Sequence, residues 1–344
     1  MKRTDRLDNK YMPINKNVLV VGGAGYIGSH TVLALQETGF NPIIYDNFSS
    51  GHRDAVFSDH VVEGELSHSI HLRDTMRKYD VGSVIHFAAL IEAGQSVVEP
   101  LLFYRNNLAS TVSLLEAMQE ADVTRLVFSS TAAVYGNQPE IGLLHEGLPI
   151  QPTNPYGQTK AAVEAMLRDT AAASNLKAIA LRYFNASGAD ARARAGERHD
   201  PETHLIPLIL QVAAGQRDQI TVFGNDYQTK DGSCIRDYVH VTDLARGHVA
   251  ALEKLLARDA KIGGFTPINL GTGRGYSVRE VIETAKRVTN RHISVVDGQR
   301  RLGDPSMLVS DPSRAHIELN WRAEHSSLEN IITDAWNFMQ RGLS

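Results

Sequence analysis

The chain is poor in cysteine: Cys234 is the only one among its 344 residues. A disulfide within the chain is therefore impossible, and we expect a reducing, cytoplasmic compartment. No apolar run approaches the length of a membrane span. The segment Met1–Lys16 is polar and lacks the apolar core of a secretory signal, so we interpret it as a leader before the first strand.

The chain also carries little net charge. The formal charge is −4, with 42% hydrophobic and 22% charged residues. This balance gives no basis for expecting nucleic acid or an anionic membrane as a partner. Arginines cluster at Arg192, Arg194 and Arg198, but no aromatic residues alternate with them, so a solvated loop is expected there. The length suits one large domain and a smaller second one.

Glycines are concentrated after the first apolar run. A Val/Leu-rich segment from Asn17 leads into Gly22, Gly23, Gly25 and Gly28. A strand, tight turn and helix start of this kind bring backbone amides close to a diphosphate. About 20 residues further on, a second apolar run ends at Asp46, whose carboxylate can hold both ribose hydroxyls and would repel a 2′-phosphate. We therefore predict a dinucleotide site that prefers NAD; the alternative is an ordinary glycine-rich turn.

Alternating apolar runs and helical periodicity predict a doubly wound parallel α/β sheet in the first half of the chain. The expected strands are 17–22, 42–45, 60–63, 83–88, 125–130 and 177–184, and the expected helices 26–38, 69–79, 99–119 and 158–174. In such a sheet, ligands bind at the carboxyl ends of the strands.

The second half carries different signals. From residue 186 the sequence becomes polar and glycine-punctuated, and we place a domain boundary there. Three later helix starts are expected, one capped by Thr242 and two with capping boxes, Ser277 with Glu280 and Ser326 with Glu329. The predicted domains are a leader at 1–16, a dinucleotide-binding domain at 17–185 with 236–258 packed back onto it, and a smaller mixed α/β substrate domain at 186–344.

Tyr156 and Lys160 are four residues apart at the start of an alanine-rich helix, so they share one face. A neighbouring ammonium favours the phenolate form of tyrosine and lowers the phenol pKa. The pair follows a strand that ends at Thr131, and the carboxyl end of that strand should lie near the dinucleotide. We predict that Tyr156 acts in proton transfer; the alternative is a surface pair beside a structural strand end.

Several segments together resemble the UDP-glucose 4-epimerase family of extended short-chain dehydrogenases. They are the glycine turn with Asp46-Asn47, the Tyr156/Lys160 pair, and His86–Ala89, Phe128–Thr131, Val134–Gly136, Leu181–Asn185, Phe223–Tyr227, Arg236–Val241 and Arg300–Asp304. The resemblance runs from about residue 17 to the C-terminal helix, and it implies a Rossmann-type cofactor domain.

The resemblance implies interconversion of UDP-galactose and UDP-glucose. Tyr156 would take the proton of the sugar 4-hydroxyl, Thr131 would share that proton, and bound NAD would take the C4 hydride. Lys160 would bind the nicotinamide ribose. The resulting 4-ketopyranose would turn over and receive the hydride on its other face.

The resemblance also implies the binding residues. The cofactor residues would be Gly22, Gly25, Tyr26, Ile27, Gly28, Asp46, Asn47, Glu65, Leu66, Phe87, Ala88, Ala89, Asn107, Thr131, Tyr156, Lys160, Tyr183 and Phe184. The UDP-hexose residues would be Thr131, Tyr156, Asn185, Thr203, His204, Leu205, Thr221, Phe223, Arg236, Arg301, Asp304 and Leu308. The two arginines suit a diphosphate; the alternative for each is an ion pair with Asp237 or Asp304. Similar enzymes form homodimers, here through helix 99–119 and the helix from Thr159.

Other functions stay open. Leu308 stands where side-chain size separates plain hexoses from N-acetylated ones, so an epimerase for N-acetylhexosamines or uronates is an alternative. A 4,6-dehydratase would need an acid and a base beside Thr131, where this chain has Ala132 and Ala133. A non-catalytic NAD sensor on the same fold is the alternative from a different class, but it would not need the tyrosine and lysine.

No metal is expected. His68 and His71 have a metal-like spacing, and His199 and His204 lie near Asp200 and Glu202. Neither group has a third ligand that the sequence arranges with it, and hydride transfer needs no metal.

Overall fold

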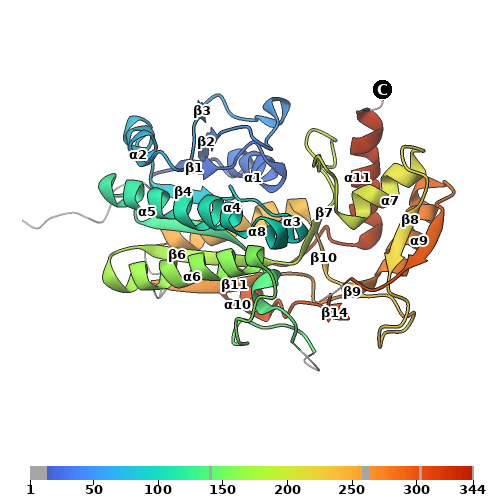
Figure 1. Cartoon of the computed structure of the whole chain (residues 1–344). Coiled ribbons are helices and arrows are strands. Elements are labelled where there is room, and N and C mark those ends of the chain that lie inside the picture. Colours follow the sequence, from blue (N-terminus) through green and yellow to red (C-terminus); the bar gives the residue numbers. More distant parts are fainter. Residues whose placement is uncertain (1–13, 139–141, 258–263, 302–303, 343–344) are drawn as a thin grey trace, which may run out of the picture.

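The computed structural model describes residues 14–138, 142–257, 264–301 and 304–342. Two lobes lie side by side, a larger one that contains the glycine turn and a smaller one built from the later part of the chain (Figure 1). The larger lobe holds a seven-stranded sheet in the order β11-β6-β5-β4-β1-β2-β3. Its strands are β1 (Asn17–Val21), β2 (Asn41–Asp46), β3 (Val61–Glu63), β4 (Ser83–His86), β5 (Arg125–Thr131), β6 (Lys177–Tyr183) and β11 (Phe265–Leu270).

All the strand pairs of this sheet are parallel. The chain builds outward from β1 to β3 and then returns to place β4 on the other side of β1. Such a reversal opens a crevice at the carboxyl ends of the strands, where ligands of doubly wound sheets bind. The predicted fold class is confirmed. The domain boundaries remain a prediction, and they did not include β11, which extends the sheet beside β6.

The sheet is buried on both faces, as its unbroken apolar strands predicted. Val18 and Val20 of β1 belong to a core with α1 (Tyr26–Glu37), α8 (Val241–Leu256) and α10 (Ser313–Leu319). Leu19 and Val21 of the same strand belong to a second core with α2 (Ser69–Lys78), α5 (Ser110–Glu120) and α6 (Pro155–Ala173). Successive residues of a strand point to opposite faces, so one Val/Leu run serves both cores.

The smaller lobe has its own core around two parallel strands. Helices α7 (Leu205–Ala213), α9 (Val278–Thr289) and α11 (Leu328–Arg341) pack beside β8 (Ile220–Phe223) and β13 (Val295–Gly298). Short pairings join this lobe to the sheet: β7 (Asn185–Ser187) with β10 (Tyr238–His240), and β9 (Ile235–Arg236) with β12 (Tyr276–Ser277) and β14 (Met307–Leu308). Among the described helices, none has the length and apolar character that crossing a membrane requires.

The remaining elements lie near the sheet edge or on the helical face of the larger lobe. They are the 3-10 turns η1 (Arg53–Ala55) and η3 (Ala132–Tyr135), α3 (Ala93–Val98), α4 (Pro100–Phe103) and the π-helical η2 (Tyr104–Ala109). The single helix predicted at 99–119 is thus α4, η2 and α5 in sequence. Asn107 in the π-helical turn is buried and exchanges hydrogen bonds with the backbone of Leu90. Hydrophobic periodicity in the sequence does not reveal that this contact interrupts the regular helix.

Of the three predicted caps, one is confirmed. Ser277 and Glu280 form the expected capping box of α9. Helix α8 begins two residues earlier than expected, and the side chain of His240 caps it in place of Thr242. Ser327 caps α11, because the hydroxyl of Ser326 instead donates a hydrogen bond to Asp243. The caps of α8 and α11 differ from the prediction because side chains distant in the sequence hold the residues involved.

Three buried histidines predict a steep loss of stability in acid. Burial lowers the pKa of His30 to about 4, of His86 to about 3 and of His248 to about 4. The unfolded chain protonates all three below about pH 6.5, whereas the folded chain does not. The contribution of these three histidines to the free energy of unfolding is therefore full above pH 6.5 and falls below it, with a slope that approaches about 4 kcal/mol per pH unit. Urea unfolding between pH 5 and 7 measures this slope.

The variant His248→Leu should reduce the histidine contribution to that slope by about a third, since one of three equivalent protons is removed. An unchanged slope would contradict this assignment.

Candidate active site

A cavity of about 760 Å³ lies between the two lobes. Residues at the carboxyl ends of β1, β2, β4, β5 and β6 line one side, and residues from the segment before α7, from β8 and from β9 line the other. Thus the crevice expected at the strand ends is closed over by the smaller lobe. A cavity of this size between two lobes is a typical small-molecule site.

The glycine turn after β1 requires its glycines. Gly22 has φ +80°, and a Cβ there would lie 2.6 Å from the backbone nitrogen of Ala88. A Cβ on Gly28 would lie 2.1 Å from the carbonyl oxygen of Gly22. Without side chains, the turn, the end of β4 and the start of α1 approach closely, and the amides of α1 face the cavity. This arrangement fits a diphosphate, as predicted.

Asp46 closes the far end of the same wall. Its carboxylate is buried and accepts hydrogen bonds from the backbone nitrogens of Ala24 (2.9 Å) and Phe48 (2.8 Å). Each carboxylate oxygen has a further lone pair, so both can still accept from ribose hydroxyls. Next to it, the Asn47 amide donates to the Glu65 carboxylate at 3.1 Å.

The cavity is lined by most of the predicted cofactor residues: Gly22, Gly25, Tyr26, Ile27, Gly28, Asp46, Asn47, Glu65, Leu66, Phe87, Ala88, Ala89, Thr131, Tyr156, Tyr183 and Phe184. Asn107 and Lys160 are not among its lining residues. Asn107 instead holds Leu90, its amide oxygen accepting from the Leu90 nitrogen at 2.8 Å. Lys160 is buried behind the wall, and its Nζ donates to the carbonyl oxygen of Ser129 at 2.8 Å.

Tyr156 and Thr131 meet at the carboxyl end of β5. Burial raises the pKa of the Tyr156 phenol well above its usual range, and a hydrogen bond with Thr131 opposes the rise. Burial also lowers the pKa of Lys160 to about 7, against the attraction of Glu164. The sequence predicted that Lys160 would lower the phenol pKa, but burial dominates and raises it.

Several supporting residues were missed by the sequence reasoning. Glu164, one turn beyond Lys160, forms a buried ion pair with Arg182 at 2.6 Å and accepts from the Ser130 hydroxyl. Ser129 and Tyr183 share a hydroxyl–hydroxyl hydrogen bond of 2.5 Å beside the cavity. These contacts fix the ends of β5 and β6 on which Thr131 stands. The only feature of the sequence that could have revealed these residues was the presence of polar side chains in otherwise apolar strands.

The opposite wall of the cavity brings together nine of the residues predicted to bind the UDP-hexose: Asn185, Thr203, His204, Leu205, Thr221, Phe223, Arg236, Arg301 and Asp304. Arg236 forms an ion pair with Asp304, which is the alternative that the sequence left open for it. Arg301 stacks over the ring of Phe223, 4.2 Å from its centroid. Leu308 is not among the lining residues; it packs beside Val134, Tyr135 and Leu144.

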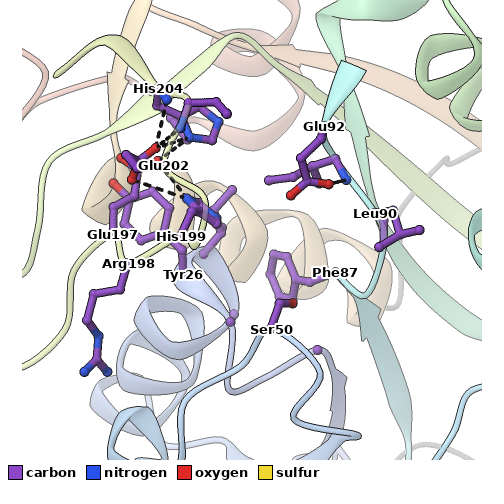
Figure 2. Close-up of a pocket in the computed structure, with 18 of the residues that line it drawn as sticks. Tyr26, Ser50, Phe87, Leu90, Glu92, Glu197, Arg198, His199, Glu202 and His204 are labelled. Atoms are coloured by element: carbon purple, nitrogen blue, oxygen red, sulfur yellow. Dashed lines mark hydrogen bonds and ion pairs between the residues drawn. The ribbon is translucent and has the colours of Figure 1, made fainter. Parts of the chain in front are cut away.

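A compact histidine–glutamate cluster also stands in this wall (Figure 2). Nδ1 of His204 lies 2.9 Å from Glu197 and 3.0 Å from Glu202. Burial lowers the pKa of His204, but the hydrogen bonds to both carboxylates outweigh it and raise that pKa to about 10. Glu197 is the partner that the sequence did not associate with these histidines, so the stated reason for expecting no metal fails here.

Comparison with known proteins decides the family. Residues 18–263 match the family model of the NAD dependent epimerase/dehydratase family. The chain belongs to this family. A UDP-glucose 4-epimerase of Halalkalibacterium halodurans is 47% identical, covering 93% of this chain and 95% of that protein. One of Rhizobium leguminosarum bv. trifolii is 46% identical, covering 94% and 97%.

Solved structures of the family agree. A UDP-glucose 4-epimerase from Brucella ovis in complex with NAD has a TM-score of 0.90 at 49% identity, covering 94% of this chain and 98% of that one. The enzyme of Bifidobacterium longum in complex with NAD+ and UDP has a TM-score of 0.88 at 34% identity, covering 95% and 99%. The recognition made from the sequence motifs is confirmed.

For a family member with this turn, Gly28→Ala should weaken NAD binding by more than about 100-fold, because a methyl 2.1 Å from the Gly22 carbonyl must push the turn out of its anion-binding shape. Titration calorimetry of NAD with the stripped protein measures the loss.

The matched control is Gly142→Ala, because a Cβ at that exposed residue has no atom within 4 Å. The control should bind NAD like the parent chain. Equal affinity in the Gly28 variant would contradict the assigned turn.

Proposed function

We propose that the protein is an NAD-dependent UDP-glucose 4-epimerase that interconverts UDP-galactose and UDP-glucose. The main support is the position of two side chains: the buried phenol of Tyr156 and the hydroxyl of Thr131 lie together at the strand edge of a cavity that the glycine turn also lines. The opposite wall offers Arg236 and Arg301, whose planar donor groups suit a diphosphate. The names of the relatives support the same activity.

Catalysis begins with proton removal by Tyr156. The phenolate accepts the proton of the sugar 4-hydroxyl, and Thr131 hydrogen-bonds the same oxygen and shares the proton. NAD, when bound, supplies the hydride acceptor and a positive ring that favours the phenolate. Lys160 adds charge from behind, and its amine, with a pKa of about 7, gains a proton readily when a ribose hydroxyl and the phenolate approach it.

The second wall controls the intermediate. After oxidation at C4 the sugar is a 4-ketopyranose, which must turn over before the hydride returns to its other face. UDP therefore has to stay bound while the sugar moves. Residues of the smaller lobe, including His204, Phe223 and Arg301, line the cavity where the nucleotide is expected, and their grip on UDP keeps the intermediate from leaving.

The chain is further proposed to act as a cytoplasmic homodimer. Apolar side chains of the helices around 99–119 are exposed: Val98 is 79% exposed and Leu101 is 77% exposed. Val97, Tyr104 and Val112 extend this surface. A second copy of the chain, joined helix to helix, would bury it. A single cysteine fits a reducing compartment.

Tyr156→Phe should lower kcat by about 100- to 10,000-fold, because the proton acceptor is removed while the ring is kept. The assay follows UDP-glucose formed from UDP-galactose without added reductant, and NAD content is measured in parallel. Tyr79→Phe is the matched control, since Tyr79 lies outside the cavity lining. Unchanged turnover by the Tyr156 variant would refute the mechanism; a 4-keto-6-deoxy product would indicate a dehydratase.

The double variant Val98→Glu/Leu101→Glu should convert the dimer to a monomer in sedimentation experiments, because two carboxylates would have to be buried at the interface. Ile317→Glu on α10 is the control, since Ile317 is equally exposed, at 79%, but lies on another surface. A dimer that survives the double variant would exclude these helices as the interface.

A further inference from the structure

The segment between β7 and α7 brings four potential metal ligands to one point. One ligand atom from each of Glu197, His199, Glu202 and His204 lies within 4.8 Å of all the others. In Figure 2 the four side chains lie close together beside Tyr26 at the start of α1. The two carboxylates are almost fully buried, with side-chain exposures of 6% for Glu197 and 7% for Glu202.

The spacing fits a four-coordinate cation. Glu197 lies 3.2 Å from Nδ1 of His199 and 2.9 Å from Nδ1 of His204. Glu202 lies 3.9 Å and 3.0 Å from the same two nitrogens. Ligand atoms about 2.0–2.2 Å from a tetrahedral zinc ion are about 3.3–3.5 Å apart. The four separations given above lie on both sides of this value, and the remaining pairs of ligand atoms lie within 4.8 Å, so side-chain movements would be needed to complete the coordination.

A second observation points into the cluster. Nδ1 of His199 is buried and has no hydrogen-bond partner, although a Glu197 oxygen lies 3.2 Å away. A buried imidazole nitrogen without a partner is costly, and a cation between it and the carboxylates would use its lone pair. The ring is held in place by an edge-on contact with Tyr26 at 6.3 Å and by the ring of His204 at 4.9 Å.

Neighbouring arginines are engaged elsewhere. Arg198 lies between two members of the cluster in sequence, but its side chain points away in Figure 2 and pairs with Asp54 at 2.7 Å. Arg194 pairs with Asp190 at 2.6 Å. Neither arginine therefore pairs with the two buried carboxylates, which contact the histidines; Glu202 also accepts hydrogen bonds from the backbone nitrogens of Thr203 and His204, both at 2.8 Å.

We propose that Glu197, His199, Glu202 and His204 bind one divalent transition-metal cation, with zinc the best-matched ion. Two imidazoles and two carboxylates form a ligand set that zinc accepts, whereas calcium and magnesium prefer oxygen ligands alone. The ion would tie the segment before α7 into the cavity wall. The site takes no part in hydride transfer, but His204 also lines the cavity where UDP is expected, so the test measures metal binding itself rather than epimerase activity.

The test is Zn²⁺ titration of the NAD-loaded protein after chelator treatment, with a competing indicator, followed by Co²⁺ substitution. We expect one Zn²⁺ per chain and the visible absorption of tetrahedral cobalt. Loss of an outer-shell partner weakens metal binding about 10–100-fold, and His199→Ala or Glu197→Gln, which removes a ligand, should weaken it more. His292→Ala is the control because His292 is exposed and outside the cluster.

A crystal grown with Zn²⁺ should give an anomalous peak within about 2.0–2.2 Å of the four ligand atoms. Thermal melting and NAD content establish that each variant is folded, and Glu197→Gln, which keeps the side-chain shape, serves if His199→Ala does not fold. The absence of saturable binding would overturn the proposal and leave a protonated His204 as the counter-charge. Binding that is equal in His199→Ala, Glu197→Gln and the parent chain would overturn it as well.

Discussion

The parallel alignment of β1, β2, β4, β5 and β6 is the constraint on which the rest of the structure depends. Because these strands run in one direction, their carboxyl ends meet at a single edge, and every loop that follows them opens into the same cavity. Gly22, Asp46, Ala88, Thr131 and Tyr183 are far apart in sequence but line that cavity for this reason alone. Successive residues of each strand pack alternately into the two cores, which holds this edge between two helical layers.

Burial at this edge sets the chemistry. It raises the phenol pKa of Tyr156 and lowers the pKa of Lys160 to about 7. Both shifts have the same cause, burial, which disfavours the charged form of each side chain. The ligands that enter the cavity must restore the charge that proton transfer needs.

The local patterns that decided the fold were readable in the sequence. Unbroken apolar runs predicted the buried parallel strands, and the glycine spacing predicted the turn, because both are dictated by sterics within a few residues. The spacing of Ser277 and Glu280 likewise predicted a capping box, which the structure contains. The lining of one cavity by Tyr156 and Thr131 followed from the strand order, and the comparisons confirmed the family on which the remaining site residues were predicted.

What could not be predicted depends on partners distant in the chain. The π-helical turn lies where the Asn107 side chain hydrogen-bonds to Leu90. Ser326 does not cap α11 as expected, because its hydroxyl donates a hydrogen bond to Asp243. Strand β11 joins β6 from a part of the chain assigned to the other lobe. Glu197 lies only two residues before His199, but in a polar segment without periodicity, so its place beside both histidines became visible only once that segment was folded.

The central claim is that one hydrogen leaves C4 of the sugar and returns to C4 on the other face without meeting solvent. UDP-galactose carrying deuterium at C4 tests it most directly, with the UDP-glucose product analysed by mass spectrometry and NMR. The account predicts that the deuterium is retained at C4 of the product. Washout of the label into water, or its appearance at another carbon, would contradict it.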